Sequence, residues 1–146
     1  MRKIRRFREL SFDDRALLIH ALILLPIAKV FLQLGGFNRT RRFFARMFAH
    51  TRSVLDEQSA EQRARATMRI VAAAAAHGLC RATCLPQSLV GWALLRQQGL
   101  DPELRFGARK RAHELEAHAW VELGSIAFEA DSEQLEQPFV PFTKAV

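Results

Sequence analysis

Apolar residues in the first half of the chain recur with the period of a helix, and the longest apolar run lies near the start. The run covers residues 16–28, and the pattern around it predicts a helix over residues 12–34. Ser11 followed by Asp14 is typical of a helix start, and the glycine pair at 35–36 is typical of a helix end. The chain therefore opens with a long apolar helix.

Two more helices are predicted before residue 78. Residues 39–55 place phenylalanines and a methionine on one face and arginines on the other. The next helix is predicted over residues 59–76. Ser59 is its candidate N-cap, with Gln62 in the capping-box position, and the helix should stop near Gly78. The apolar face of each helix is expected to pack against a core.

A fourth helix is predicted after a short irregular entry. Pro86 is well tolerated in the first turn of a helix, and the apolar residues that follow it continue to Gly99. Cys84 therefore lies at the N-terminus of this helix.

The pattern changes to strands after residue 100. Residues 104–109, 117–123 and 126–130 are the predicted strands, and residues 110–116 are predicted to be a charged loop. Gly124 and Ser125 form a two-residue hairpin turn between the last two strands. Helices first and strands last predict an α+β domain.

Length and composition fit one compact domain. The chain has 146 residues, of which 49% are apolar, so we expect a single domain over residues 1–146, with a helical part at 1–78 and a catalytic core at 79–146. Two cysteines are too few for a secreted disulfide framework, which indicates the reducing cytoplasm. The apolar run is shorter than the ~20 residues of a spanning helix, so we expect no transmembrane segment, although contact with a membrane surface stays open.

The positive charge is concentrated in the first third of the chain. Residues 1–52 hold 12 of the 22 Lys and Arg residues and 3 of the 15 Asp and Glu residues, and the net charge of the whole chain is +7. Such a segment attracts nucleic acid, an anionic membrane or an acidic peptide. No zinc-finger spacing or aromatic RNA-binding box accompanies it in the sequence, so we expect no nucleic acid partner.

Cys84 and His118 suggest thiol chemistry. The N-terminus of a helix favours thiolate over thiol, and it lowers a cysteine pKa below the free value of about 8.5. A nucleophile also needs a base, and the strand that contains AHAWVEL supplies His118. A cysteine at a helix start followed by a histidine on a strand is the order found in papain-like and transglutaminase-like enzymes. The alternative is a buried thiol and a histidine with an ordinary structural role.

The hairpin turn predicts which acid lies beside His118. With a two-residue loop, residue 123 pairs with 126 and residue 122 with 127, so His118 lies opposite Asp131. Glu129 lies opposite Trp120 on the same face, whereas Ala130 points to the other face. An acid beside His118 would hold its tautomer and stabilise the imidazolium. Asp131 is the first candidate and Glu129 the second.

Four segments together resemble a known family. RATCLPQSLVGWALLRQQG, LRFGARK and EAHAWVE look like the Cys and His motifs of the lasso-peptide B protein, a transglutaminase-like cysteine peptidase, and RRFRELSFDDRALLIHALILL resembles the helical opening of its stand-alone form. The resemblance implies a leader peptidase with Cys84 as nucleophile and His118 as base. The usual Asp of the family would fall near Ala130, so the acid stays open between Asp131 and Glu129.

The resemblance also implies partners. The substrate would be a ribosomally made precursor peptide, a separate leader-recognition protein would hold its leader, and an ATP-using lasso cyclase would take the freed core. The basic, apolar first third is the expected docking surface for the leader-recognition protein. The backbone N–H of Cys84 is one candidate oxyanion donor, and Thr83 and Gln87 are weak side-chain candidates.

Other interpretations of the same residues were weighed. His77, Cys80 and Cys84 have a spacing that would suit zinc on one helix face, but Gly78 and Pro86 break that helix, so we expect no metal and no cofactor. Two alternative functions remain: a non-catalytic basic helical module that binds a peptide or a membrane surface, and an acyl transferase of transglutaminase type.

Overall fold

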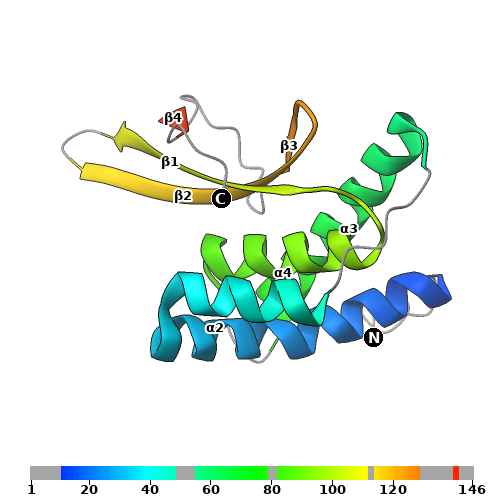
Figure 1. Cartoon of the computed structure of the whole chain (residues 1–146), viewed down its shortest axis with the longest axis horizontal. Helices are drawn as coiled ribbons and strands as arrows, with labels where there is room; N and C mark the ends of the chain where they lie inside the picture. Colours follow the sequence, from blue (N-terminus) through cyan, green and yellow to red (C-terminus); the bar gives the residue numbers. More distant parts are fainter. Residues whose placement is uncertain (1–10, 49–54, 79–81, 112–113, 129–139, 142–146) are drawn as a thin grey trace.

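The protein is an α+β domain, as the sequence predicts, and its described residues form three helices and a small antiparallel sheet. The computed structural model describes residues 11–48, 55–78, 82–111, 114–128 and 140–141. In Figure 1 the helices form one layer and the strands a second layer above them. The elements are α2 (Phe12–Met47), α3 (Glu57–His77), α4 (Cys84–Gln97), β1 (Glu103–Arg111), β2 (Glu114–Leu123), β3 (Ile126–Phe128) and β4 (Val140–Pro141).

Helix α2 folds back on itself at Gly36, which has φ 69° and ψ 175°. Twelve residues of straight helix would rise about 18 Å, yet the ring centroids of Phe31 and Phe43 are 4.8 Å apart. The hydroxyl of Thr40 donates to the carbonyl oxygen of Gly36 at 2.8 Å and closes the turn. The two predicted helices are therefore two arms of one hairpin (Figure 1), and the predicted break at residues 35–36 is confirmed.

The ends of the first two helices follow local capping chemistry. The backbone N–H of Asp14 donates to the Ser11 hydroxyl at 3.1 Å, as predicted. The predicted N-cap at Ser59 is wrong, because Asp56 caps α3 and accepts a hydrogen bond from the Ser59 N–H at 3.1 Å. Hydrogen bonds from Ser59 lower the pKa of Asp56. A carboxylate is a strong acceptor near the positive end of a helix, so the helix begins at the acid and not at the hydroxyl.

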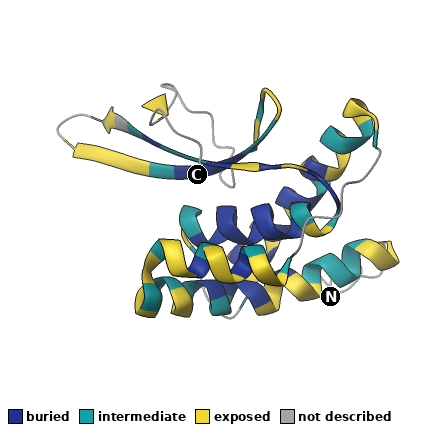
Figure 2. Cartoon of the chain, viewed as in Figure 1, coloured by how far each residue is buried: buried dark blue, intermediate teal, exposed yellow. Residues whose placement is uncertain are grey.

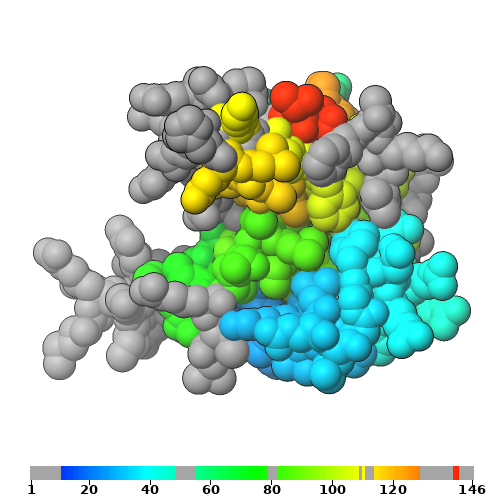
Figure 3. Space-filling model, turned by 90° about the vertical axis from the view of Figure 1, so that its left-hand side faces the viewer, coloured from blue at the N-terminus to red at the C-terminus, as the bar shows by residue number. Residues whose placement is uncertain are grey.

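Helix α4 lies at the centre of the molecule, between the other helices and the sheet. Figure 2 shows it as a mainly buried ribbon, and Pro86 through Leu95 are all buried. Figure 3 shows the green atoms of α4 between the blue and cyan atoms of α2 and the yellow strands. The first residue of a helix that is enclosed in this way is held in a fixed place, and here that residue is Cys84.

The sheet has the strand order β3-β2-β1-β4, with antiparallel neighbours. Val121 pairs with Phe128 and Leu123 with Ile126, which confirms the two-residue turn over the described pairs. The charged loop predicted at 110–116 is wrong, because β1 continues to Arg111 and β2 already starts at Glu114.

The register explains why this charged segment is extended. Arg109 pairs with Glu116, and Arg111 pairs with Glu114. The backbone of this segment is paired residue by residue with the neighbouring strand, so a run of charged residues is compatible with a strand here.

Segment Phe12–Met47 is the one helix in the described ranges that is long and apolar enough to cross a membrane by length and composition. A core helix of a soluble protein and a signal sequence pass the same test. Ala21, Leu25 and Ala28 are at most 2% exposed and belong to the core that α2 shares with α3 and α4. The expectation that no segment spans the membrane stays a prediction.

Candidate functional site

Cys84 is the first residue of α4, where the sequence predicts it. Its N-cap, Thr83, is extended and makes no side-chain capping bond. Gln87 holds the incoming chain instead, because its side-chain amide donates to the carbonyl oxygen of Ala82 at 2.7 Å. The first N–H groups of any helix have no acceptor within the helix, so those at the start of α4 are available to a group that lies beside the thiol.

Helix α4 is fastened to β2 next to the histidine. The hydroxyl of Ser88, which is fully buried, donates to the carbonyl oxygen of Ala119 at 2.8 Å. Ser88 lies four residues after Cys84, so both side chains are on the helix face that meets β2. His118 precedes Ala119, and its side chain is the main influence on the pKa of the Cys84 thiol. The half-buried thiol and the imidazole are thus held together by the packing of one helix on one strand.

This geometry lowers the pKa of the Cys84 thiol. The largest contribution is the hydrogen bond with His118, whereas partial burial acts in the opposite direction. The backbone N–H of Ala119, the charge of His118 and the N–H of Leu85 also lower it. All of these groups stabilise the thiolate, the form of cysteine that attacks carbonyl carbon.

The remaining candidates lie outside the described residues. Asp131 and Glu129, the two acids considered for the third role, fall there, as does Cys80. Within the described ranges, no group of three His, Cys, Asp or Glu residues is placed to hold a metal ion. The arrangement that the structure does show is a thiol–imidazole pair.

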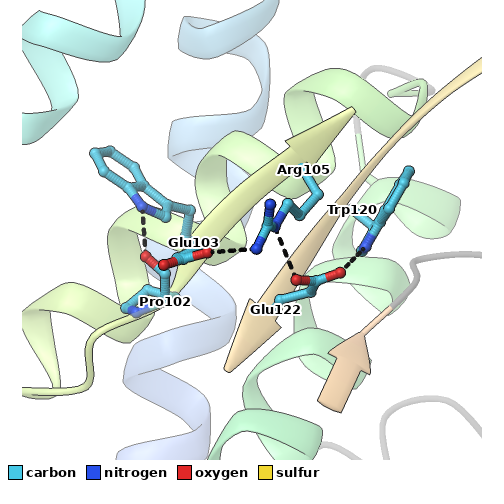
Figure 4. Close-up of polar contacts among 6 residues, drawn as sticks. Pro102, Glu103, Arg105, Trp120 and Glu122 are labelled. Carbon is cyan, nitrogen blue, oxygen red and sulfur yellow. Dashed lines mark hydrogen bonds and ion pairs between the residues drawn. The ribbon is translucent and has the colours of Figure 1, made fainter. Parts of the chain in front are cut away.

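Sequence reasoning missed a polar network beside this pair. Trp120 Nε1 donates to Glu122 Oε1 at 2.9 Å, and Arg105 Nε donates to Glu122 Oε2 at 2.8 Å (Figure 4). Arg105 also forms an ion pair with Glu103 at 2.9 Å. Strand parity could have shown that residues 118, 120 and 122 share one face of β2. The partners of these residues on β1 could not be predicted without the register between the two strands.

The comparison with protein families is decisive for the family of this chain. The model of the transglutaminase-like superfamily matches residues 29–144, which include both Cys84 and His118. The chain belongs to the transglutaminase-like superfamily. No curated protein and no solved structure matches it. A transglutaminase-like domain fits a cysteine peptidase or a transglutaminase-type acyl transferase, and both start from a nucleophilic thiolate.

The lowered pKa of the thiol in this transglutaminase-like domain predicts a specific pH dependence of alkylation. A thiolate reacts and a thiol does not, so the iodoacetamide rate rises as the pH passes upward through the pKa. In a Cys80→Ala background, we expect the half-maximal rate of Cys84 below the pH of about 8.5 that is typical of a free thiol. His118→Gln should move the midpoint upward. An identical midpoint in 8 M urea, about the concentration that unfolds most small domains, would contradict a folded-state effect.

Proposed function

We propose that this protein is a cysteine peptidase that removes the leader peptide from a ribosomally made lasso-peptide precursor before macrocyclisation. The observation that carries the proposal is the place of Cys84 at the start of a buried helix that is bonded to β2 next to His118, the side chain that does most to lower the pKa of the thiol. Membership of the transglutaminase-like superfamily supports the thiol chemistry. The resemblance of the segments around both residues to the lasso-peptide B protein supports the substrate.

Cleavage proceeds in two balanced steps. The Cys84 thiolate adds to the carbonyl carbon at the leader–core junction, the C–N bond breaks, and the imidazolium of His118 gives its proton to the leaving amine. The leader is then held as a thioester. His118 takes a proton from water, the hydroxide attacks the thioester, and the Cys84 thiolate leaves, so the enzyme returns to its starting state.

The N–H of Cys84 is the best-placed candidate for the oxyanion donor. It lies in the first turn of α4, where backbone donors have no helical acceptor. The side chain of Gln87 binds Ala82, which gives this amide a structural task at the entry to the helix. Thr83 is exposed.

We propose that a separate leader-recognition protein docks on the first arm of α2. Five large apolar residues follow one stripe at spacings of 7, 4, 7 and 4, which covers about 33 Å of helix. They are between 48% and 84% exposed: Phe12, Ile19, Ile23, Val30 and Leu34. An exposed apolar stripe of this length is unusual on a protein that acts alone. The excess of Lys and Arg in residues 1–52 fits a partner with an acidic surface.

The exposed stripe on α2 predicts the effect of a charge on partner-dependent cleavage. The purified chain should cleave its precursor slowly, and the leader-recognition protein should raise the rate by holding the leader close, an effect on the order of 10²-fold. Ile23→Glu should remove most of this gain and leave the slow basal rate unchanged. Leu115→Glu is the matched control, because Leu115 is 75% exposed but lies on β2.

The outcomes of this docking experiment differ clearly. Equal rates with and without the partner would contradict the proposed docking. If Ile23→Glu instead abolished binding to anionic vesicles and left the gain from the partner intact, the stripe would be a membrane surface.

One experiment tests the reaction itself. The protein is incubated with a cognate precursor, with and without the leader-recognition protein, and the masses of the products are measured by mass spectrometry. Leader and core that together gain the mass of one water indicate a peptidase. In a parallel reaction, hydroxylamine is added. If it is incorporated into the leader and no water adduct forms, the result would indicate acyl transfer to an amine, which superfamily membership also fits. An uncleaved precursor under all conditions would favour a non-catalytic binding module.

The proposal also gives the protein a place in a reaction sequence. Hydrolysis frees the amino group of the core, and closing a ring on that amine requires an activated carboxyl group, which an ATP-using cyclase supplies. Two cysteines are too few for the disulfide framework of a small secreted protein, so we propose the cytoplasm as the place of action.

A further inference from the structure

The ring of His118 lies beside a second ring on the same face of β2. The centroids of His118 and Trp120 are 6.2 Å apart, and the two planes differ by 18°. Trp120 is 4% exposed. Residues i and i+2 of a strand share one face, so the indole forms a wall parallel to the imidazole.

The nitrogen end of this indole is fixed by a carboxylate. Nε1 of Trp120 donates to Glu122 at 2.9 Å, and the other carboxylate oxygen of Glu122 accepts from Arg105 at 2.8 Å (Figure 4). Arg105 is held in turn by Glu103. With both of its oxygens bound, Glu122 has one orientation, and it transmits that orientation to the indole.

The benzene end of the indole is seated over a glycine. Gly107 pairs with His118 in the register of β1 and β2. A Cβ atom on Gly107 would lie 2.5 Å from the carbonyl oxygen of Val140 on β4, and 2.8 Å from Cη2 and 2.9 Å from Cζ3 of Trp120, distances that real Cβ atoms essentially never show. The absence of a side chain at residue 107 therefore provides the space that the indole fills next to His118.

We infer that Trp120 is a positioning residue, which holds the His118 imidazole against Cys84, and that Glu122 and Gly107 fix Trp120 at its two ends. The inference rests on the proposed function of the Cys84–His118 pair. Rotation about the second side-chain torsion of histidine is broadly allowed, so the ring needs a neighbour to select one orientation. A parallel aromatic face also favours the imidazolium form, which in turn favours the thiolate.

Several charged and titratable groups surround this histidine. Helix α4 contributes Cys84, strand β1 contributes Arg105 through its bond to Glu122, and β2 carries Glu116 and Glu122 on the same face as His118. The variants below leave Cys84, Glu116 and Arg105 in place, so a change in the reactivity of Cys84 reports on the orientation and charge state of His118.

The test measures the pH midpoint of Cys84 alkylation by iodoacetamide in the Cys80→Ala protein. Trp120→Leu should raise the midpoint by about half a unit, which lowers reactivity at pH 6 about threefold. Glu122→Ala should shift it in the same direction, and Glu122→Gln, which keeps an acceptor for Nε1, should restore it. The side chain of Glu122 is 22% exposed, so these two variants serve even if Trp120→Leu does not fold.

Trp92→Leu is the matched control. Trp92 is 5% exposed, its Nε1 donates to the carbonyl oxygen of Pro102 at 3.1 Å, and Arg96 lies 4.9 Å from its ring centroid. It therefore matches Trp120 in burial and hydrogen bonding but has no contact with His118 among those the structure gives. Its loss should lower the melting temperature and leave the alkylation midpoint unchanged.

Failure of the inference and failure of the proposed function give different results. An ordinary midpoint in the Cys80→Ala parent would overturn the thiolate–imidazolium pair and the proposed function with it. A lowered midpoint in the parent that neither Trp120→Leu nor Glu122→Ala moves would overturn the positioning role alone. A shift in Trp92→Leu as large as that in Trp120→Leu would show general loosening of the core and would also overturn it.

Discussion

Replacing Cys84 by alanine is expected to abolish cleavage of a cognate precursor, with a loss of at least about 10⁴-fold. The substitution removes the sulfur atom that forms the thioester in the proposed mechanism. The measurement is the initial rate of release of the core peptide, followed by mass spectrometry in the presence of the leader-recognition protein.

Cys80→Ala is the control for this loss. It also removes one thiol and leaves the nucleophile, so it should keep most of the activity. Circular dichroism should show both variants folded, because Cys84 is half-buried and alanine is well tolerated in a helix. Wild-type rates in Cys84→Ala would refute the enzyme hypothesis.

Features that depend on local chemistry were predictable from the sequence. The cap at Ser11 and the break at residues 35–36 follow from the preferences of single residues and their near neighbours. The place of Cys84 at the start of α4 follows from the same kind of signal. The choice of Ser59 as N-cap failed because a stronger acceptor, Asp56, lies three residues earlier.

Strand pairing was predictable where a turn defines it. The two-residue turn at 124–125 determines which residues face each other, and the described pairs agree with it. The segment 110–116 was wrongly predicted as a loop because its charge was taken as a sign of a loop. Lys110 and Glu114 are indeed exposed, but the backbone around them pairs in the ladder of β1 and β2, and that depends on the partner strand.

Contacts between distant residues were beyond the reach of pattern reasoning. The stacking of Phe31 on Phe43 depends on the angle of the break at Gly36, and the bond from Ser88 to Ala119 depends on how α4 lies on β2. The indole of Trp120 over Gly107 needs both the register and the direction of a side chain. A single sequence specifies these through packing of the whole core, which no local window contains.

Asp131→Asn is expected to lower turnover strongly, by up to about 10⁴-fold, whereas Glu129→Gln should act mildly. The pairs that the structure gives, Leu123 with Ile126 and Val121 with Phe128, follow one rule in which the two residue numbers add to a constant. The same rule pairs His118 with Asp131, which lies outside the described residues. A carboxylate there would hold the tautomer that leaves the base nitrogen directed at Cys84.

The comparison of the two acids tests the register as well as the role. Asn keeps the size of Asp131 and removes its charge, so a selective loss of turnover with unchanged precursor binding indicates loss of an orienting carboxylate. Ala130→Ser should be tolerated, because residue 130 points to the opposite face under the same rule. A greater loss in Glu129→Gln than in Asp131→Asn would reverse the assignment. Wild-type turnover in both would mean that His118 is oriented by another group, and Trp120, which already lies against its ring, would then be the first residue to test.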